Sequence, residues 1–285
     1  MLYFHNMTGR FAPSPSGHMH IGNASTALLC WLQVKSYGGK ILLRIEDIDH
    51  ERCKKQYVDS VFEDLIKLGL DWDEQPLFQS NRENDYEAAL EFLIKKNLIF
   101  PCSCSRKDIR ESIHDQGKSH QSYPGTCLNK KLPFDGPYCL RLKNWDGYPV
   151  VRRSDNTWSY NFAVVIDDAY QEISHIVRGQ DLKECDPLQN HLRKLLSYSF
   201  PKISHAPLWL GPNKKKLTKT DGAVSLKDYY DKGWSPESIL GHIARGIGLN
   251  KDLAPINAKD LIHKYESYNW DKHSVSSREV LPLWL

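Results

Sequence analysis

The first 46 residues show a strand, a helix and a second strand in succession, and this pattern restricts the fold more than any other part of the sequence. Residues 8–12 form a short segment that could be a strand. Apolar side chains then recur at helical spacing over residues 21–37, and the Gly38-Gly39 pair ends the pattern. Residues 41–46, ILLRIE, are typical of a buried strand. Two strands joined by a helix cross over in the right-handed sense and lie parallel, so the sequence predicts an α/β fold on a parallel sheet.

The rest of the chain continues the α/β order with one interruption. We expect helices over residues 55–68, 83–96 and 187–198 and around 226–248, and a strand at SYNFAVVIDD, residues 159–168. Residues 101–149 are rich in cysteine, proline, glycine and polar side chains, and we interpret them as an insertion.

The composition excludes several classes of protein. With 40% hydrophobic residues, the 285-residue chain can bury a core of its own, and a net charge of +3 confines any nucleic-acid contact to a local patch. The sequence opens without a basic segment followed by an apolar run, and no stretch approaches the roughly 18 apolar residues of a membrane span, so we expect a cytoplasmic protein. Its seven cysteines, an odd number, favour reduced thiols over disulfides.

The loop between the first strand and the first helix lies in the segment GRFAPSPSGHMHIGNAST, residues 9–26. Ligands bind at this edge of an open parallel sheet, because helix N-termini present N–H groups and a positive dipole end. Gly17 and Gly22 would let a nucleotide approach the backbone, and His18 and His20 bring hydrogen-bond donors. The loop is neither a Walker motif nor GxGxxG, and by itself it fits a turn with exposed histidines better than a nucleotide site.

A lysine cluster, NKKKLTKTDG, occupies residues 213–222 after an apolar segment, and alone it would be a solvated charge run. However, HIG at the first helix followed much later by KLTK resembles the two signature elements of class I aminoacyl-tRNA synthetases. The segments RFAPSPSG, LRIEDID, YNFAVVIDD and IVRGQDL resemble the glutamyl subgroup of that family, and the matches run in order from residue 9 to about residue 250.

Within this subgroup the chain resembles the stand-alone paralogues that attach glutamate to queuosine, a modified base in the anticodon of aspartate tRNA. Too few residues follow Thr220 for an anticodon-binding domain, Leu182 stands where full-length ligases usually have histidine, and cysteines cluster in the insertion. The resemblance implies a Rossmann-type catalytic domain in two halves without an anticodon-binding domain. Its parts would be residues 1–100 and 150–210 for the two halves, 101–149 for a zinc-type insertion, and 211–285 for a KMSKS-like loop and a helical region.

The resemblance also implies ATP-dependent activation of glutamate as glutamyl-adenylate, with Mg²⁺ on the phosphates. The catalytic positions are matched by His20, Lys216 and Lys219, and the ATP-binding positions by His20, Gly22, Asn23 and Lys219. Asn23 and Thr218 stand where the family usually has histidine and serine, so ATP affinity is the property in which this chain would differ most.

A glutamate pocket needs two cationic groups for the carboxylates and one anion for the ammonium. At the positions that match the family, Arg10 and Arg178 supply planar guanidinium groups, and Glu46 would face the ammonium. Ser14 and Tyr160 match further positions beside the substrate. Considered as single residues, Arg10 and Glu46 could instead pair with each other across neighbouring strands, and Tyr160 could belong to the core.

Three cysteines of the insertion, Cys102, Cys104 and Cys127, could bind one tetrahedral zinc ion together with a fourth ligand. From the residues alone this fourth ligand could be His114, His120, Tyr123 or Cys139. The family pattern of CxC followed by Tyr-x-x-x-Cys matches CSC and YPGTC and implies Tyr123. The alternative is three reduced cysteines without a metal, but an insertion with so little apolar content needs another source of stability.

The partners implied are glutamate and tRNA(Asp) carrying queuosine, without a membrane, and we expect a monomer. RNA contacts could come from Lys214, Lys215, Trp209 and Trp234, although core packing is the better expectation for the tryptophans. Two other functions stay open: a shortened glutamyl-tRNA synthetase that charges a tRNA 3′ end, and a non-catalytic paralogue that binds tRNA or glutamate.

Overall fold

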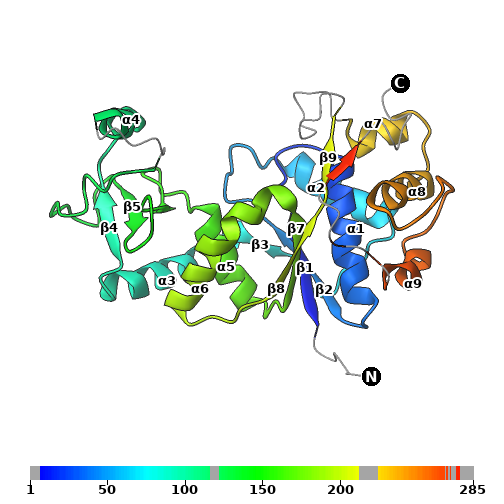
Figure 1. Ribbon diagram of the computed structural model, residues 1–285, viewed down its shortest axis with the longest axis horizontal. Coiled ribbons are helices and arrows are strands. Elements are labelled where there is room, and N and C mark those ends of the chain that lie inside the picture. The colour runs from blue at the N-terminus through cyan, green and yellow to red at the C-terminus, as the bar shows by residue number, and fades with distance from the viewer. Residues whose placement is uncertain are drawn as a thin grey trace. The chain divides into compact units, whose positions relative to one another are not determined.

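The structure, a computed structural model, describes residues 7–115, 122–211, 224–266, 268, 270 and 274–276. These residues form two compact units (Figure 1). The first unit takes the described residues up to Asn81, Glu172–Glu184, and those from Phe200 onward. The second takes Arg82–Gln171 and Cys185–Ser199.

A five-stranded parallel sheet in the order β3-β2-β1-β7-β8 forms the centre of the first unit. Its strands are β1 (Thr8–Phe11), β2 (Lys40–Ile45), β3 (Leu77–Phe78), β7 (His175–Gly179) and β8 (Lys202–Ala206). The predicted strand, helix and strand unit and its parallel pairing are therefore confirmed. The strand order runs outward from β1 to β3 on one side and through β7 to β8 on the other. Open parallel sheets bind ligands at such a reversal, here between β1 and β7.

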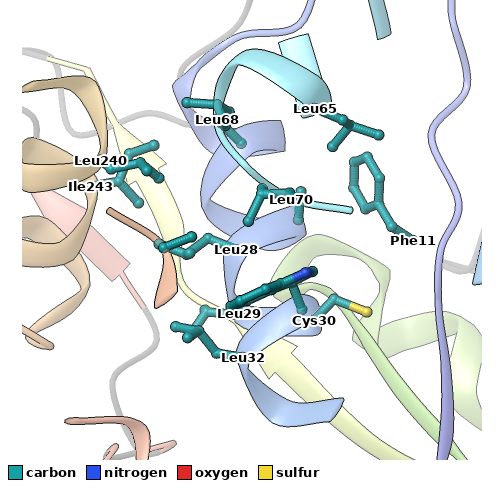
Figure 2. Packing of buried hydrophobic residues seen from close by; sticks show 14 of the residues in the cluster. Phe11, Leu28, Leu29, Cys30, Leu32, Leu65, Leu68, Leu70, Leu240 and Ile243 are labelled. Carbon is teal, nitrogen blue, oxygen red and sulfur yellow. The ribbon is translucent and has the colours of Figure 1, made fainter. Parts of the chain in front are cut away.

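Helix α1 (Ile21–Lys35) packs against this sheet and is almost completely buried. The first unit also contains α2 (Lys55–Lys67), β9 (Leu208–Leu210), α7 (Leu226–Asp231), α8 (Pro236–Ile247), α9 (Ile262–Tyr265) and β10 (Ser274–Ser276), which pairs with β9. Leu28 of α1 meets Leu240 and Ile243 of α8 on one side of the helix, while Phe11 and Leu70 lie on the other (Figure 2). Each such side chain contributes about 1.5 to 3 kcal/mol when it is fully buried, so α1 is held firmly in place.

The second unit combines a three-stranded antiparallel sheet with helices. Its elements are α3 (Glu83–Lys95), β4 (Ile99–Cys102), α4 (Arg106–Asp115), β5 (Cys139–Leu142), β6 (Val150–Arg152), α5 (Tyr160–Tyr170) and α6 (Asp186–Leu196). Helices α3, α5 and α6 pack against one another. None of the helices in the described part of the chain is both long enough and apolar enough to cross a membrane.

The expectation of a strand at residues 159–168 is wrong, because this segment forms helix α5. Residues 162–166 are all buried, and α5 packs against both α3 and α6. A helix that is covered on several sides has the same continuous apolar run as a buried strand, so periodicity could not tell the two apart.

Two buried aspartates at the end of this run join the three helices. Asp167 accepts hydrogen bonds from Arg82 Nε at 3.2 Å and from Tyr86 Oη at 2.8 Å. Asp168 accepts one from Arg193 Nη2 of α6 at 3.0 Å. Since a buried carboxylate is stable only when it is paired, these contacts fix the position of α5 between its neighbours.

Candidate active site and cysteine cluster

His20 caps the N-terminus of α1 with its own ring. Its Nδ1 accepts a hydrogen bond from the Gly22 backbone N–H at 3.1 Å, and Asn23 Oδ1 accepts one from the His20 backbone N–H at 3.3 Å. Because Nδ1 accepts, a neutral His20 ring carries its proton on Nε2, and Nε2 is then a hydrogen-bond donor. The structure therefore brings the predicted ATP-binding residues His20, Gly22 and Asn23 together at the positive end of a helix. The segment from the end of β1 to the first turn of α1 is called the ATP loop below, after this prediction.

Gly22 leaves no room for a side chain beside that ring. A Cβ atom at this position would lie 3.0 Å from His20 Cε1 and 3.1 Å from its Nδ1, and 3.8 Å from Trp209 Cδ1 of β9. Trp209 is only 3% exposed, so the expectation that it packs in the core is confirmed. Glycine is thus the residue that permits the histidine cap.

The predicted lysine loop lies outside the described residues. This holds for Lys214, Lys215, Lys216, Thr218 and Lys219. The described residues that follow it are attached to the ATP loop: Ser225 forms an isolated β-bridge with His20, and the Leu226 N–H donates to the Met19 carbonyl at 2.8 Å. The chain therefore passes beside the start of α1 directly after the lysine cluster.

Four of the five predicted glutamate residues lie on β1, β2 and β7 or just beyond their ends. Arg10 belongs to β1 and Arg178 to β7, while Ser14 and Glu46 follow β1 and β2. Arg10 and Arg178 are 3% and 4% exposed, and Arg10 Nη1 donates to the Val177 carbonyl at 3.3 Å. Ser14 Oγ donates to the Glu46 carboxylate at 3.3 Å. Two buried cations and one buried anion therefore come from three neighbouring strands.

Arg44 is a member of this site that the sequence reasoning missed. It lies on β2 with a fully buried side chain, and its Nη2 donates to Glu46 Oε1 at 3.4 Å. The signal was present in ILLRIE, because a charged residue inside a buried strand requires a partner. Tyr160, in contrast, begins α5 in the second unit, apart from the unit that holds the other four predicted residues.

The three predicted cysteines of the second unit come together at the end of β4. Their sulfur atoms all lie within 4.8 Å of one another, and Cys104 Sγ is 3.4 Å from Cys127 Sγ. The Tyr123 hydroxyl lies 3.2 Å from Cys102 Sγ and 3.7 Å from Cys104 Sγ, and it accepts a hydrogen bond from the Cys127 N–H at 2.8 Å. Three thiols thus lie together, with the Tyr123 hydroxyl beside two of the sulfur atoms.

These distances fit a tetrahedral zinc ion, for which Zn–S bonds of about 2.3 Å place sulfur atoms roughly 3.8 Å apart. Hydrogen bonds from Cys139 and then from Tyr123 lower the pKa of the Cys102 thiol to about 4, although burial opposes them. Burial raises the pKa of Cys104 to about 11. The lowered pKa of Cys102 favours the thiolate, the form that binds metal.

The other candidates for a fourth ligand differ in position. Cys139 lies opposite Cys102 on β5, and its thiol donates to the Cys102 carbonyl at 3.4 Å. The His114 side chain and the whole of His120 lie outside the described residues. All seven cysteines are thiols without disulfide partners, as the sequence predicts.

Comparison with known proteins defines the class of this chain. The family described as tRNA synthetases class I (E and Q), catalytic domain, matches residues 6–152 and 144–282. The chain therefore belongs to this family of ligases. A glutamate tRNA ligase from Elizabethkingia meningosepticum has the same fold, with a TM-score of 0.80 and 23% identity over 96% of this chain and 68% of that one.

The relatives fall into two named groups. The glutamyl-Q tRNA(Asp) synthetase of Cupriavidus metallidurans is 42% identical over 76% of this chain and 78% of its own length. That of Symbiobacterium thermophilum is 36% identical over 91% of this chain and 92% of its own length. The glutamate–tRNA ligase of Trichlorobacter lovleyi is 34% identical over 91% of this chain and 61% of the ligase. The chain thus spans less than two thirds of that ligase.

Proposed function

We propose that the chain forms glutamyl-adenylate from glutamate and ATP and transfers the glutamate to queuosine in the anticodon of tRNA(Asp). The observation that carries this proposal is the 42% identity to a glutamyl-Q tRNA(Asp) synthetase. Three glutamate–tRNA ligases are 32 to 35% identical over 91 to 97% of this chain.

In the first step an oxygen of the glutamate α-carboxylate attacks the α-phosphorus of ATP, and the bond to pyrophosphate breaks. The guanidinium groups of Arg10 and Arg178 would bind the two carboxylates, and Glu46 would bind the ammonium. Ser14 and Arg44 support this role, because both donate hydrogen bonds that orient the Glu46 carboxylate. Arg10 and Arg178 would thus face the two carboxylates of glutamate, while Arg44 stays paired with Glu46.

ATP would bind at the start of α1. His20 Nε2 and the helix N-terminus would meet the phosphates, Gly22 and Asn23 would line the nucleotide, and Lys216 and Lys219 would add positive charge. Mg²⁺ would neutralise the phosphate oxygens. The step requires orientation and charge neutralisation more than a protein base.

The second unit would carry a structural zinc ion. Cys102, Cys104, Cys127 and Tyr123 would be the zinc ligands, since Tyr123 Oη already contacts all three cysteines. Tyr160 would lie against glutamate. Residues 101–149 would then form a module held together by the metal within the synthetase domain.

In the second step a hydroxyl oxygen on the cyclopentene ring of queuosine attacks the carbonyl carbon of the adenylate. An ester bond forms, AMP leaves with the electron pair of the broken anhydride bond, and the hydroxyl proton passes to the phosphate or to water. Aspartate tRNA would have to present an unstacked anticodon base for this reaction.

Transfer of labelled glutamate to three purified tRNAs tests the proposal. The tRNAs are tRNA(Asp) with queuosine, tRNA(Asp) with guanine at the same position, and tRNA(Glu). We expect label on the first alone. Label on tRNA(Glu) would favour the second candidate, a shortened ligase, which the 34% identity to a glutamate–tRNA ligase supports. If none of the three tRNAs is labelled and glutamate-dependent ATP–pyrophosphate exchange is also absent, a non-catalytic binding protein would be favoured.

A further inference from the structure

His18 lies two residues before His20 in the ATP loop, and it contacts α2 instead of α1. Its Nδ1 lies 3.0 Å from Ser60 Oγ on α2, and its ring meets the Tyr57 ring edge-on with 5.3 Å between centroids. Nothing in the proposed reaction uses these contacts. They attach the loop to a second helix, which takes no other part in the site.

Asp64 determines the direction of the hydrogen bond between His18 and Ser60. Ser60 Oγ donates to Asp64 Oδ2, one helical turn further along, at 3.4 Å. Although this is long for an O–H···O bond, an ionised carboxylate can only accept, so the single hydroxyl proton points to Asp64. With its proton directed to Asp64, Ser60 Oγ accepts from His18, and this arrangement assigns the His18 proton to Nδ1.

The neutral rings of the two histidines in the loop are thus held as opposite tautomers. His20 Nδ1 accepts from the Gly22 N–H, so the proton of a neutral His20 ring is on Nε2, whereas His18 carries its proton on Nδ1. Between them, Met19 is 3% exposed and its carbonyl accepts the Leu226 N–H. Three successive residues therefore bind three different helices, α2, α7 and α1.

We propose that Ser60 and Asp64 are positioning residues for ATP: through His18 they hold the loop so that His20 presents its Nε2–H to the phosphates. This inference deepens the proposed function and rests on it for the identity of the ligand. It requires no contact between α2 and the substrate. Loss of the link would remove the hydrogen bond of the loop to α2, and ATP would then have to order this part of the loop on binding.

The surroundings of Asp64 make the link sensitive to pH. Burial raises the pKa of this carboxyl to about 6, while Lys67 acts to lower it and Glu63 to raise it from the same helix. Tyr230 of α7 also faces Asp64, whose charge adds to the burial that raises the tyrosine pKa. Below about pH 6 a protonated Asp64 can donate to Ser60. Asp64 then no longer requires the Ser60 proton and no longer fixes the direction of the link.

Affinity for ATP, measured by calorimetry, tests the proposal together with KM and kcat in ATP–pyrophosphate exchange. We expect Ser60→Ala to raise Kd and KM for ATP about fivefold, the usual effect of one hydrogen bond, with kcat within about twofold of the parent. Ser60→Thr keeps the hydroxyl and should restore both constants. Asp59→Asn is the matched control, because the Asp59 carboxylate on the same helix pairs with the exposed Lys55 at 2.7 Å.

Equal ATP affinity in Ser60→Ala and the parent would overturn the proposal, as would a Ser60→Thr variant as weak as Ser60→Ala. The ATP affinity measured by calorimetry separates this inference from the proposed function. A parent protein that binds ATP without exchanging pyrophosphate would refute the proposed function, and the Kd values of the variants would still decide the role of Ser60.

Two further readouts distinguish positioning from a general loss of structure. The terminal phosphate of ATP itself titrates near pH 6, so the informative quantity is the ratio of the Kd of Asp64→Asn to that of the parent, in which the ligand contribution cancels. This ratio should approach one as the pH falls below about 6. Nitrogen-15 NMR at about pH 8 should show the proton of His18 on Nδ1 and that of His20 on Nε2. The same tautomer at both residues would contradict the proposal.

Discussion

Replacement of Gly22 by alanine should reduce adenylate formation while it leaves the stability of the fold almost unchanged. The new Cβ atom would lie 3.0 Å from His20 Cε1 and 3.1 Å from Nδ1, so the ring must move by a few tenths of an ångström. Weakening the N-cap costs about 1 kcal/mol of stability. Alanine stabilises a helix by up to about 1 kcal/mol relative to glycine, so this gain nearly cancels the cost of the weakened N-cap.

The catalytic effect has no such compensation. A misplacement of about 1 Å can lower a rate about 100-fold, and we expect a shift of a few tenths of an ångström at His20 Nε2 to lower it about tenfold. ATP–pyrophosphate exchange with glutamate measures the rate, and thermal unfolding of the same samples serves as the control. The melting temperature should stay within about 4 °C of the parent. An unchanged exchange rate would refute the role of His20, and a fall of more than about 10 °C would refute the stability argument.

Three further substitutions test other parts of the account. Cys127→Ser should abolish the zinc content measured by mass spectrometry and lower the melting temperature; a parent that binds no zinc would contradict the ligand set. Asp168→Ala removes a carboxylate partner of the buried Arg193 and should lower the free energy of unfolding by about 3 kcal/mol or more in urea titrations; a change below about 1 kcal/mol would refute this. Burial raises the pKa of Asp64 from 3.8 to about 6, so its contribution to stability is present below pH 3.8 and is lost as the pH rises through about 6. Urea titrations of Asp64→Asn should lack this fall, and a parallel fall in both proteins would refute the assignment.

Local patterns in the sequence were sufficient for the part of the fold that holds the ATP loop. The helical spacing after residue 21 and the Gly38-Gly39 stop predict α1, and the buried run ILLRIE predicts β2. Both elements are specified by neighbouring residues. The crossover between them then follows from chain chirality.

Tertiary context decided the elements that the sequence did not predict correctly. Residues 160–170 form a helix because α3 and α6 cover them, and a single sequence contains no record of those neighbours. Arg44 is compatible with a buried strand because it is paired, with Glu46 within 3.4 Å of it. The link from His18 to Ser60 joins residues 42 positions apart, which no local pattern would indicate.

The cysteine cluster combines both kinds of information. The spacing of Cys102 and Cys104 suggested a metal site, whereas the choice of Tyr123 over Cys139 came from the family resemblance alone. The structure places the Tyr123 hydroxyl against the cysteines, 3.2 Å from Cys102 Sγ, and it also keeps the Cys139 thiol beside Cys102, so both remain near the cluster.

The most direct test of the central claim locates the glutamate on the tRNA. Queuosine-containing tRNA(Asp) is prepared with a 2′,3′-dideoxyadenosine at its 3′ end, which removes the hydroxyls needed for ordinary charging. Periodate is avoided, because it would also oxidise the cyclopentene diol of queuosine. The account predicts that the tRNA is labelled as well as its unblocked form and that nuclease digestion recovers the label in the anticodon fragment. Label that disappears when the 3′ end is blocked would contradict the account and identify an enzyme that charges tRNA at its terminus.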